Sequence, residues 1–138
     1  MHAVSCADVP KFTVVVGGSF GAGNYGMCGR AYSPRFMWMW PNAKIAVMAG
    51  ENAASVLMQV KAAAAKKAGV EIDKAELVAM HKEATTRFDA TSSAAFASGH
   101  LWDDGIIEPT ETRKTLALAL SAAANAPVQP TKFGVFRM

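Results

Sequence analysis

Residues 14–30 read VVVGGSFGAGNYGMCGR, an apolar β-branched run that passes directly into a glycine-rich stretch. Two short motifs fit inside this stretch. Residues 17–21 match G-x-S-x-G, the nucleophile elbow of serine hydrolases, and residues 21–26 match G-x-G-x-x-G, the dinucleotide fingerprint. Both motifs predict a strand, a tight turn and a helix, so the candidate functional site lies at a strand-to-helix turn.

In the hydrolase interpretation, Ser19 is the nucleophile of a catalytic triad. The acid and the histidine then follow in the chain, and two pairs have the required order: Asp89 with His100, and Asp73 with His81. Few residues precede the first strand, however, whereas the nucleophile of an α/β-hydrolase follows a sheet of several strands. A five-residue motif also arises readily by chance in a glycine-rich loop, so Ser19 stays the minority alternative.

The dinucleotide interpretation has two weaknesses. Residues 17–20 separate the apolar run from the first glycine of the fingerprint, which should follow its strand almost at once. The acid that binds the ribose is expected about 20 residues further on, but residues 37–41 hold no carboxylate and Glu51 comes late. This interpretation is weaker than the hydrolase one.

Both motifs share one physical requirement. Small residues after a strand let the backbone N–H groups at a helix N-terminus approach an anion without an intervening side chain. An oxyanion hole needs such donors, and removing one typically costs about 2.7–4 kcal/mol of transition-state stabilisation. The alternative left open by the local pattern is a close packing of helix on strand that binds no ligand.

Composition narrows the class of protein. A chain of 138 residues with 51% hydrophobic and 18% charged residues predicts one folded domain. No apolar run reaches the length of about 20 residues that spans a bilayer, and residues 1–10 do not resemble a signal peptide. A soluble, intracellular protein without membrane or nucleic-acid partners is expected, because the net charge of +3 comes from scattered basic residues.

The apolar pattern predicts strands early in the chain and helices late, which is an α/β arrangement. Residues 36–40 could form a strand or an apolar helical turn. Residues 11–16 have the pattern of a buried parallel strand, residues 44–48 are expected to form a second strand of a parallel sheet, and residues 106–107 a short strand. Expected helices comprise residues 51–68, a capped helix from Asp73 with Glu76 to about residue 88, a short helix before residue 100, and residues 109–125.

A parallel sheet this small and apolar must be covered on both faces and at both edges, and the expected helices can hardly cover all of them. Residues 2–8 also read as the last turns of a helix without a start signal. We therefore expect the chain to be a piece of a larger subunit.

Several other residues have a structural alternative beside a functional one. His100 with Asp103 and Asp104 resembles a metal cluster only loosely, and aspartates that cap backbone in a turn are the expected arrangement. No metal is predicted. Trp38, Met39 and Trp40 could be core or subunit-interface residues. Cys6 and Cys28 are expected to be reduced packing residues, because they lack metal spacing and a disulfide framework.

Longer segments carry more information than either short motif. Residues 9–57, WDDGIIEPTETR at 102–113 and the terminal FGVFRM at 133–138 resemble the carboxyltransferase subunits of biotin-dependent acyl-CoA carboxylases. Residues 21–36, GAGNYGMCGRAYSPRF, are the most specific part of this resemblance. The family implies a crotonase-like fold of stacked ββα units, with one domain for the acyl-CoA and one for carboxybiotin. Residues 1–138 look like part of the second, C-terminal domain, so the isolated chain is expected to be inactive.

The resemblance implies transfer of CO2 from carboxybiotin to an acyl-CoA, with 3-methylcrotonyl-CoA, an intermediate of leucine breakdown, as the first candidate. Geranyl-CoA and propionyl-CoA are the alternatives. Two oxyanions arise in such a transfer, the ureido oxygen of biotin and the enolate of the thioester, and the family stabilises each with paired backbone N–H groups. Because the biotin nitrogen takes the substrate proton, this chemistry requires no nucleophile, histidine or metal from the protein.

Residue by residue, the resemblance assigns the oxyanion hole for biotin to the backbone amides of Ala22 and Gly23. Gly21 allows the close approach, and Phe20 together with Ser19 shapes the turn. A partner α subunit is expected to carry the biotin, and the β subunits are expected to form a homo-oligomer. The implied location is the cytoplasm in a bacterium or the mitochondrial matrix in a eukaryote.

Overall fold

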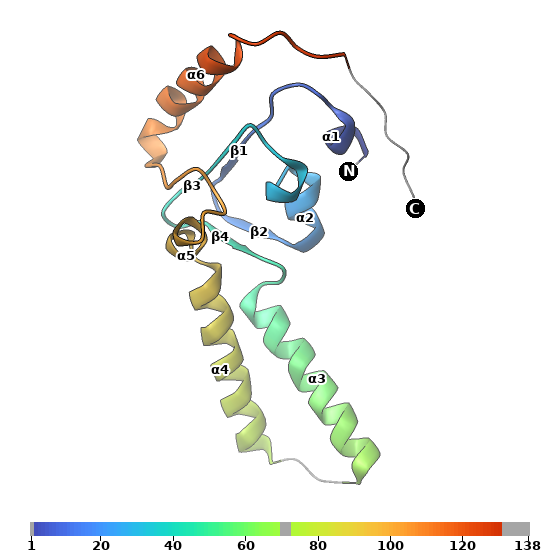
Figure 1. Cartoon of the computed structure of the whole chain (residues 1–138). Coiled ribbons are helices and arrows are strands. Elements are labelled where there is room, and N and C mark those ends of the chain that lie inside the picture. The colour runs from blue at the N-terminus through green and yellow to red at the C-terminus, as the bar shows by residue number, and fades with distance from the viewer. Residues whose placement is uncertain (1, 70–72, 131–138) are drawn as a thin grey trace.

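The computed structural model describes residues 2–69 and 73–130 (Figure 1). Its first half comprises α1 His2–Cys6, β1 Phe12–Val15, β2 Gly18–Phe20, α2 Gly21–Gly26, the 3-10 helix η1 Arg30–Tyr32, β3 Phe36–Met39 and β4 Lys44–Ala46. Its second half comprises α3 Gly50–Ala68, α4 Lys74–Ser92, α5 Ala94–Gly99, the 3-10 helix η2 Pro109–Glu111 and α6 Thr112–Ala123.

The strands form two small parallel pairs. β1 pairs with β3, with Val15 opposite Met39, and β2 pairs with β4, with Ser19 opposite Ile45. The strand alternative for residues 36–40 is thereby confirmed, and so is the parallel direction expected for the apolar runs. Observed strands are shorter than expected, because the chain bends between β1 and β2 and again between β3 and β4.

Strand β2 corrects the expectation of a tight glycine turn at residues 17–21. The chain bends at Gly17, Ser19 lies within strand β2, and a second turn at Gly21, called the glycine turn below, joins β2 to α2. Two hydrogen bonds join the β1–β2 connection to the β3–β4 connection: Trp40 N donates to Val15 O at 2.9 Å, and Lys44 N donates to Gly17 O at 3.0 Å. The two connections therefore run side by side from the first strand pair to the second. Because glycine is depleted in strands, the apolar pattern did not predict β2.

The expected strand at residues 106–107 is present only as a single parallel bridge between Ile106 and Met39. Ile107 N donates to Met39 O at 2.9 Å, and Met39 N donates to Gly105 O at 3.2 Å. This segment therefore continues the β1–β3 pair at one edge without forming a strand of its own.

The core lies where the strands meet α5. Met39 is fully buried, and it packs with Val15, Met37, Ala43, Ala94 and Ala97, against which Ile45 also packs. Burying one large apolar side chain contributes about 1.5–3 kcal/mol. The alanines of α5 let the helix approach the strands closely, so this short helix closes the core.

Helices α3 and α4 lie side by side and extend away from the strands, whereas α6 lies at the opposite end of the molecule (Figure 1). Gly69 ends α3 in a left-handed conformation with φ +68, which glycine adopts without strain. Asp73 caps α4 by accepting from Ala75 N at 3.1 Å, as expected. Glu76 does not complete the expected capping box but accepts from Lys61 Nζ at 2.7 Å, which joins the two helices.

Helix α4 is longer than expected, and the last helix begins later. α4 runs to Ser92, where Ser93 takes over as the N-cap of α5 by accepting from Phe96 N at 3.3 Å. Pro109 opens the 3-10 helix η2 before α6 begins. Trp40 Nε1 donates to Thr112 Oγ1 at 3.0 Å, so the start of α6 is tied to the end of β3.

Large apolar side chains remain exposed on several elements. Val47 is 84% exposed, Met27 78% and Leu101 76%. Within the described ranges, none of the helices combines the length and apolarity that crossing a bilayer requires.

Candidate oxyanion site at the glycine turn

The junction between β2 and α2 depends on Gly21. Its φ is +52, and a Cβ built on it would come within 3.0 Å of Val47 O. Left-handed backbone costs an L-residue about 1–2 kcal/mol, and the nearby carbonyl adds a steric limit. Gly21 therefore meets both requirements of the turn at once, and the direction of α2 follows from it.

The first backbone amides of α2 are free to donate. Phe20, the N-cap residue, is extended and has no side-chain hydrogen bond to the helix, because a phenyl ring has no acceptor of the kind that capping side chains offer. The N–H groups in the first turn of a helix lack intrahelical acceptors. Ala22 and Gly23 are exposed, and a Cβ on Gly23 would meet no atom within 4 Å. Both amides can therefore be approached by an anion from outside.

Ser19, the serine of the G-x-S-x-G motif, is hydrogen-bonded to an asparagine, whereas a serine nucleophile needs a histidine or another base. Ser19 Oγ accepts from Asn24 Nδ2 at 2.8 Å, so the side chain connects β2 to α2. Asn24 also packs closely on Gly29, where an added methyl group would overlap its amide. Sequence reasoning did not predict the hydrogen bond between Asn24 and Ser19 or the contact of Asn24 with Gly29. The available signal was an amide residue in the first turn of a helix, where such side chains bond to nearby groups.

A cavity of about 350 Å³ lies beside this turn. Its walls come from β1, the bend at Gly17, and the side of α2 that carries Asn24 and Met27. Ser19 and Gly29 also line it. Both residues that contact the Asn24 side chain therefore belong to the wall of one cavity.

The two candidate triads for Ser19 are not assembled in the described residues. Asp89 Oδ1 accepts from Lys44 Nζ at 2.9 Å, and Asp73 Oδ1 is occupied as the cap of α4. His100 Nδ1 contacts Phe96 O at 2.8 Å, and its ring stacks on that of Phe96 with 4.2 Å between centroids. Both candidate acids and His100 are thus engaged elsewhere.

The turn after α5 holds its two aspartates against backbone, as expected. Asp103 Oδ1 accepts from Gly105 N at 2.9 Å, and Asp104 Oδ2 accepts from Met37 N at 2.8 Å. The second bond links the turn to β3, so it is not local. Among residues 2–69 and 73–130, no three His, Cys, Asp or Glu side chains gather in a geometry that could hold a metal ion.

Trp38 and Met39 are buried, with 8% and 0% exposure, so the core alternative applies to both. Trp40 is half-buried and bonded to α6. The two cysteines, Cys6 and Cys28, are buried and free of disulfides, which confirms their prediction as packing residues.

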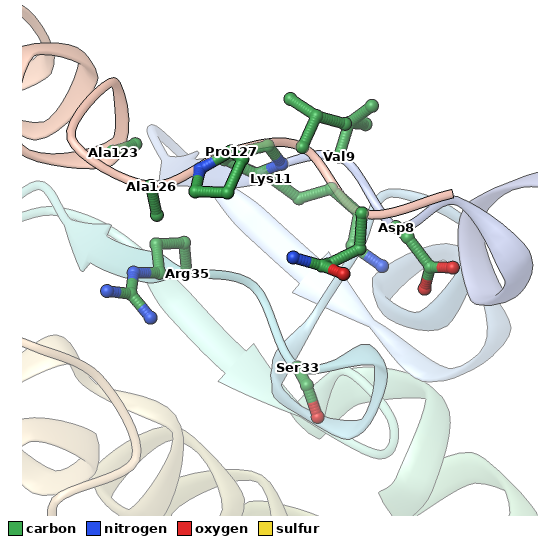
Figure 2. A pocket seen from close by; sticks show the side chains of 11 residues that line it. Asp8, Val9, Lys11, Ser33, Arg35, Ala123, Ala126 and Pro127 are labelled. Atoms are coloured by element: carbon green, nitrogen blue, oxygen red, sulfur yellow. The ribbon is translucent and has the colours of Figure 1, made fainter. Parts of the chain in front are cut away.

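A separate cavity of about 260 Å³ lies between the N-terminal loop, the loop before β3 and the segment after α6 (Figure 2). Lys11 and Arg35 are its cationic residues. In Figure 2 the carbon stem of Arg35 lies toward Ala126 but its guanidinium turns away from that residue, and Ser33 points away from Ala126 as well. Lys11 Nζ donates to Val4 O at 2.9 Å. Because these polar groups do not converge, this cavity offers no single point for an anion.

Comparison with known proteins shows which family the chain resembles. The model of the family described as Carboxyl transferase domain matches residues 1–136. The chain is 54% identical over 136 residues to the probable methylcrotonoyl-CoA carboxylase beta chain, mitochondrial, of Drosophila melanogaster, covering 99% of this chain and 24% of the relative. It is 52% identical to the biotin-dependent 3-methylcrotonyl-coenzyme A carboxylase beta1 subunit of Mycobacterium tuberculosis, covering 99% and 26%. The chain thus spans about a quarter of the length of these curated relatives.

Similar solved structures point to the same family. The geranyl-CoA carboxylase beta subunit of P. aeruginosa superposes with a TM-score of 0.78 at 40% identity, covering 99% of this chain and 26% of that one. Transcarboxylase 12S, described as a hexamer assembly with hydrolysed methylmalonyl-coenzyme A bound, superposes with a TM-score of 0.74 at 31% identity, covering 99% and 25%. The expected crotonase-like α/β fold is confirmed. On these matches, the chain belongs to the carboxyl transferase domain family.

Proposed function

We propose that this chain forms the biotin-facing part of a carboxyltransferase subunit that moves CO2 from carboxybiotin to an acyl-CoA. The observation that carries the proposal is the 54% identity, over 99% of the chain, to a methylcrotonoyl-CoA carboxylase beta chain. The first candidate substrate is therefore 3-methylcrotonyl-CoA. The alternatives have weaker support, at 40% identity for the geranyl-CoA carboxylase and 28% for an acetyl-/propionyl-coenzyme A carboxylase subunit.

In this proposal the glycine turn holds the biotin. Bound carboxybiotin supplies the CO2, and negative charge then develops on its ureido oxygen. The amides of Ala22 and Gly23 would donate hydrogen bonds to that oxygen, and Gly21 with Phe20 would form the turn beside it. Support comes from the exposure of both residues, the missing side-chain cap and the open space at Gly23. Fixed donors of this kind stabilise developing charge without reorganisation during the reaction.

The remaining parts of the site belong, in this proposal, to a longer subunit and to partners. The described strands form two-stranded sheets, and a sheet of two strands is only marginally stable on its own. Large apolar side chains are exposed on the connections between the strands. A partner subunit would carry the biotin, since relatives are named biotin-dependent carboxylase subunits. A homo-oligomer of β subunits is supported by the hexamer described for the transcarboxylase.

Two possible cell compartments follow from the relatives. Relatives from animals, plants and amoebae are named as mitochondrial beta chains, whereas others come from bacteria. We therefore infer the mitochondrial matrix for a eukaryotic source and the cytoplasm for a bacterial one.

The proposal is tested with the full-length subunit in complex with its biotin-carrying partner. We expect incorporation of labelled bicarbonate into 3-methylcrotonyl-CoA that avidin abolishes, and faster turnover than with geranyl-CoA or propionyl-CoA at equal concentration. The 138-residue chain alone should give no turnover. Labelling that avidin does not block would contradict biotin dependence, and faster turnover with geranyl-CoA would reassign the substrate.

A further inference from the structure

The side chain of Asn24 is held on two sides. Its Nδ2 donates to Ser19 Oγ at 2.8 Å on one side. On the other side it packs against Gly29, whose backbone N donates to Asn24 O at 2.7 Å. Asn24 is half-buried and Gly29 is buried, so water has limited access to these contacts. The side chain therefore has one defined position.

This position links three pieces of the turn. Ser19 lies in β2 and is fixed by the pairing of β2 with β4. Asn24 lies in the first turn of α2, one residue after Gly23, and Gly29 lies beyond the end of that helix. Helix α2 has six residues and no buried member, and the ring of Tyr25 meets that of Tyr32 in η1 edge-on, with 5.8 Å between centroids, so this contact holds α2 to η1 and not to β2. The Ser19–Asn24 hydrogen bond is thus a direct restraint on how α2 sits against β2.

We propose that Asn24 is a positioning residue for carboxyl transfer: its hydrogen bond to Ser19 and its packing on Gly29 fix the direction of the Ala22 and Gly23 amides. This inference rests on the proposed function, in which those amides hold the ureido oxygen of biotin. Asn24 itself touches no reacting atom in this account. It acts through the helix that carries the donors.

The expected effect is large because oxyanion donors work over a narrow range of distances, about 2.7–3.1 Å from the charged oxygen. A misplacement of about 1 Å can cost a factor of about 100 in rate. Loss of the restraint should misplace both amides together. Substrate affinity should change little, because Asn24 makes no contact with the acyl-CoA in this proposal.

The test is a double-mutant cycle in the full-length subunit assembled with its biotin-carrying partner. Asn24→Ala should lower kcat for 3-methylcrotonyl-CoA about 10- to 100-fold and leave KM for the acyl-CoA within about twofold. Ser19→Ala should lower kcat in the same direction, and the double variant should be no slower than Asn24→Ala, because both changes break one bond. Ser19→Thr, which keeps the hydroxyl, should restore most of the loss.

Asn42→Ala is the matched control, because the Asn42 amide also donates one hydrogen bond, to Val16 O at 3.2 Å, and neither residue belongs to α2. It should keep the kcat of the unmodified enzyme. Melting temperature and assembly state are measured for each variant. A kcat for Asn24→Ala within about twofold of the unmodified enzyme overturns the inference, as does a loss that equals the loss of assembled protein.

Two further outcomes are decisive. Should Asn24→Ala fail to assemble, Ser19→Ala carries the test, since it leaves the packing of Asn24 on Gly29 in place, and an unchanged kcat for it overturns the inference. Should the unmodified enzyme show no avidin-sensitive transfer, the proposed function fails and the inference fails with it. An active unmodified enzyme with an unaffected Asn24→Ala variant overturns the inference alone.

Discussion

At the scale of single residues, the chemistry of the glycine turn depends on backbone rather than on side chains. Gly21 supplies a left-handed conformation, and Phe20 leaves the first amides of α2 uncapped. Ser19, which the G-x-S-x-G motif presented as a nucleophile, instead accepts a hydrogen bond from Asn24. Loss of a true serine nucleophile costs a factor of about a million in kcat, so the much smaller loss expected for Ser19→Ala also separates the two chemistries.

Gly21 and Gly23 make a matched pair for the backbone requirement. Gly21→Ala should destabilise the chain by about 1–2 kcal/mol or more, because alanine at φ +52 is strained and its Cβ would meet Val47 O at 3.0 Å. Gly23→Ala should stabilise it by about 0.5–1 kcal/mol, because Gly23 is helical and its Cβ would meet open space. Urea unfolding of the two variants checks the difference. Equal free energies of unfolding would show that the turn does not need glycine at position 21.

At the scale of elements, Asp104 hydrogen-bonds to the backbone of β3 at Met37, as a residue of a neighbouring strand would. It accepts from Met37 N at 2.8 Å, while Asp104 N donates to Met37 O at 2.7 Å. Met37 is 2% exposed, so an unpaired N–H there is costly. Asp104→Ala should lower the free energy of unfolding by about 1–3 kcal/mol, and Asp104→Asn should lower it less because the amide oxygen can still accept. Urea unfolding measures both, and an equal loss for the two variants would contradict this role.

The elements also show which parts of the fold could be predicted from sequence. The β-branched run of β1 and the helices α3 and α4 have strong local signals, and all three are present, whereas the aromatic run of β3 was equally compatible with a helical turn. β2 has the sequence Gly-Ser-Phe, which carries no strand signal, and it forms because β4 pairs with it. The bond between Asp104 and Met37 joins residues 67 positions apart, so local pattern could indicate a turn but not its partner.

The candidate site, like the fold, could be predicted from the sequence only in part. Gly21, Ala22 and Gly23 could be selected from the sequence because the resemblance covers them and glycine has a physical reason there. The partner of Ser19 could not, since any of several polar residues in the loop could bond to a serine hydroxyl. Only the packing of Asn24 between β2 and Gly29 selects it.

At the scale of the whole molecule, two small parallel pairs of strands present the glycine turn, while α3 and α4 extend away from them (Figure 1). Each sheet has two strands, and large apolar side chains are exposed on the connections between the strands. Family membership is established by the match over residues 1–136. The position of biotin at the turn is the central claim that the account adds.

A crystal structure of the full-length subunit with biotin bound tests that claim most directly. The account predicts the ureido oxygen about 2.7–3.1 Å from the backbone nitrogens of both Ala22 and Gly23, with Asn24 still bonded to Ser19. Biotin bound with its ureido oxygen on other donors, or with Ser19 Oγ as its nearest polar contact and the Ala22 and Gly23 amides unoccupied, would contradict it.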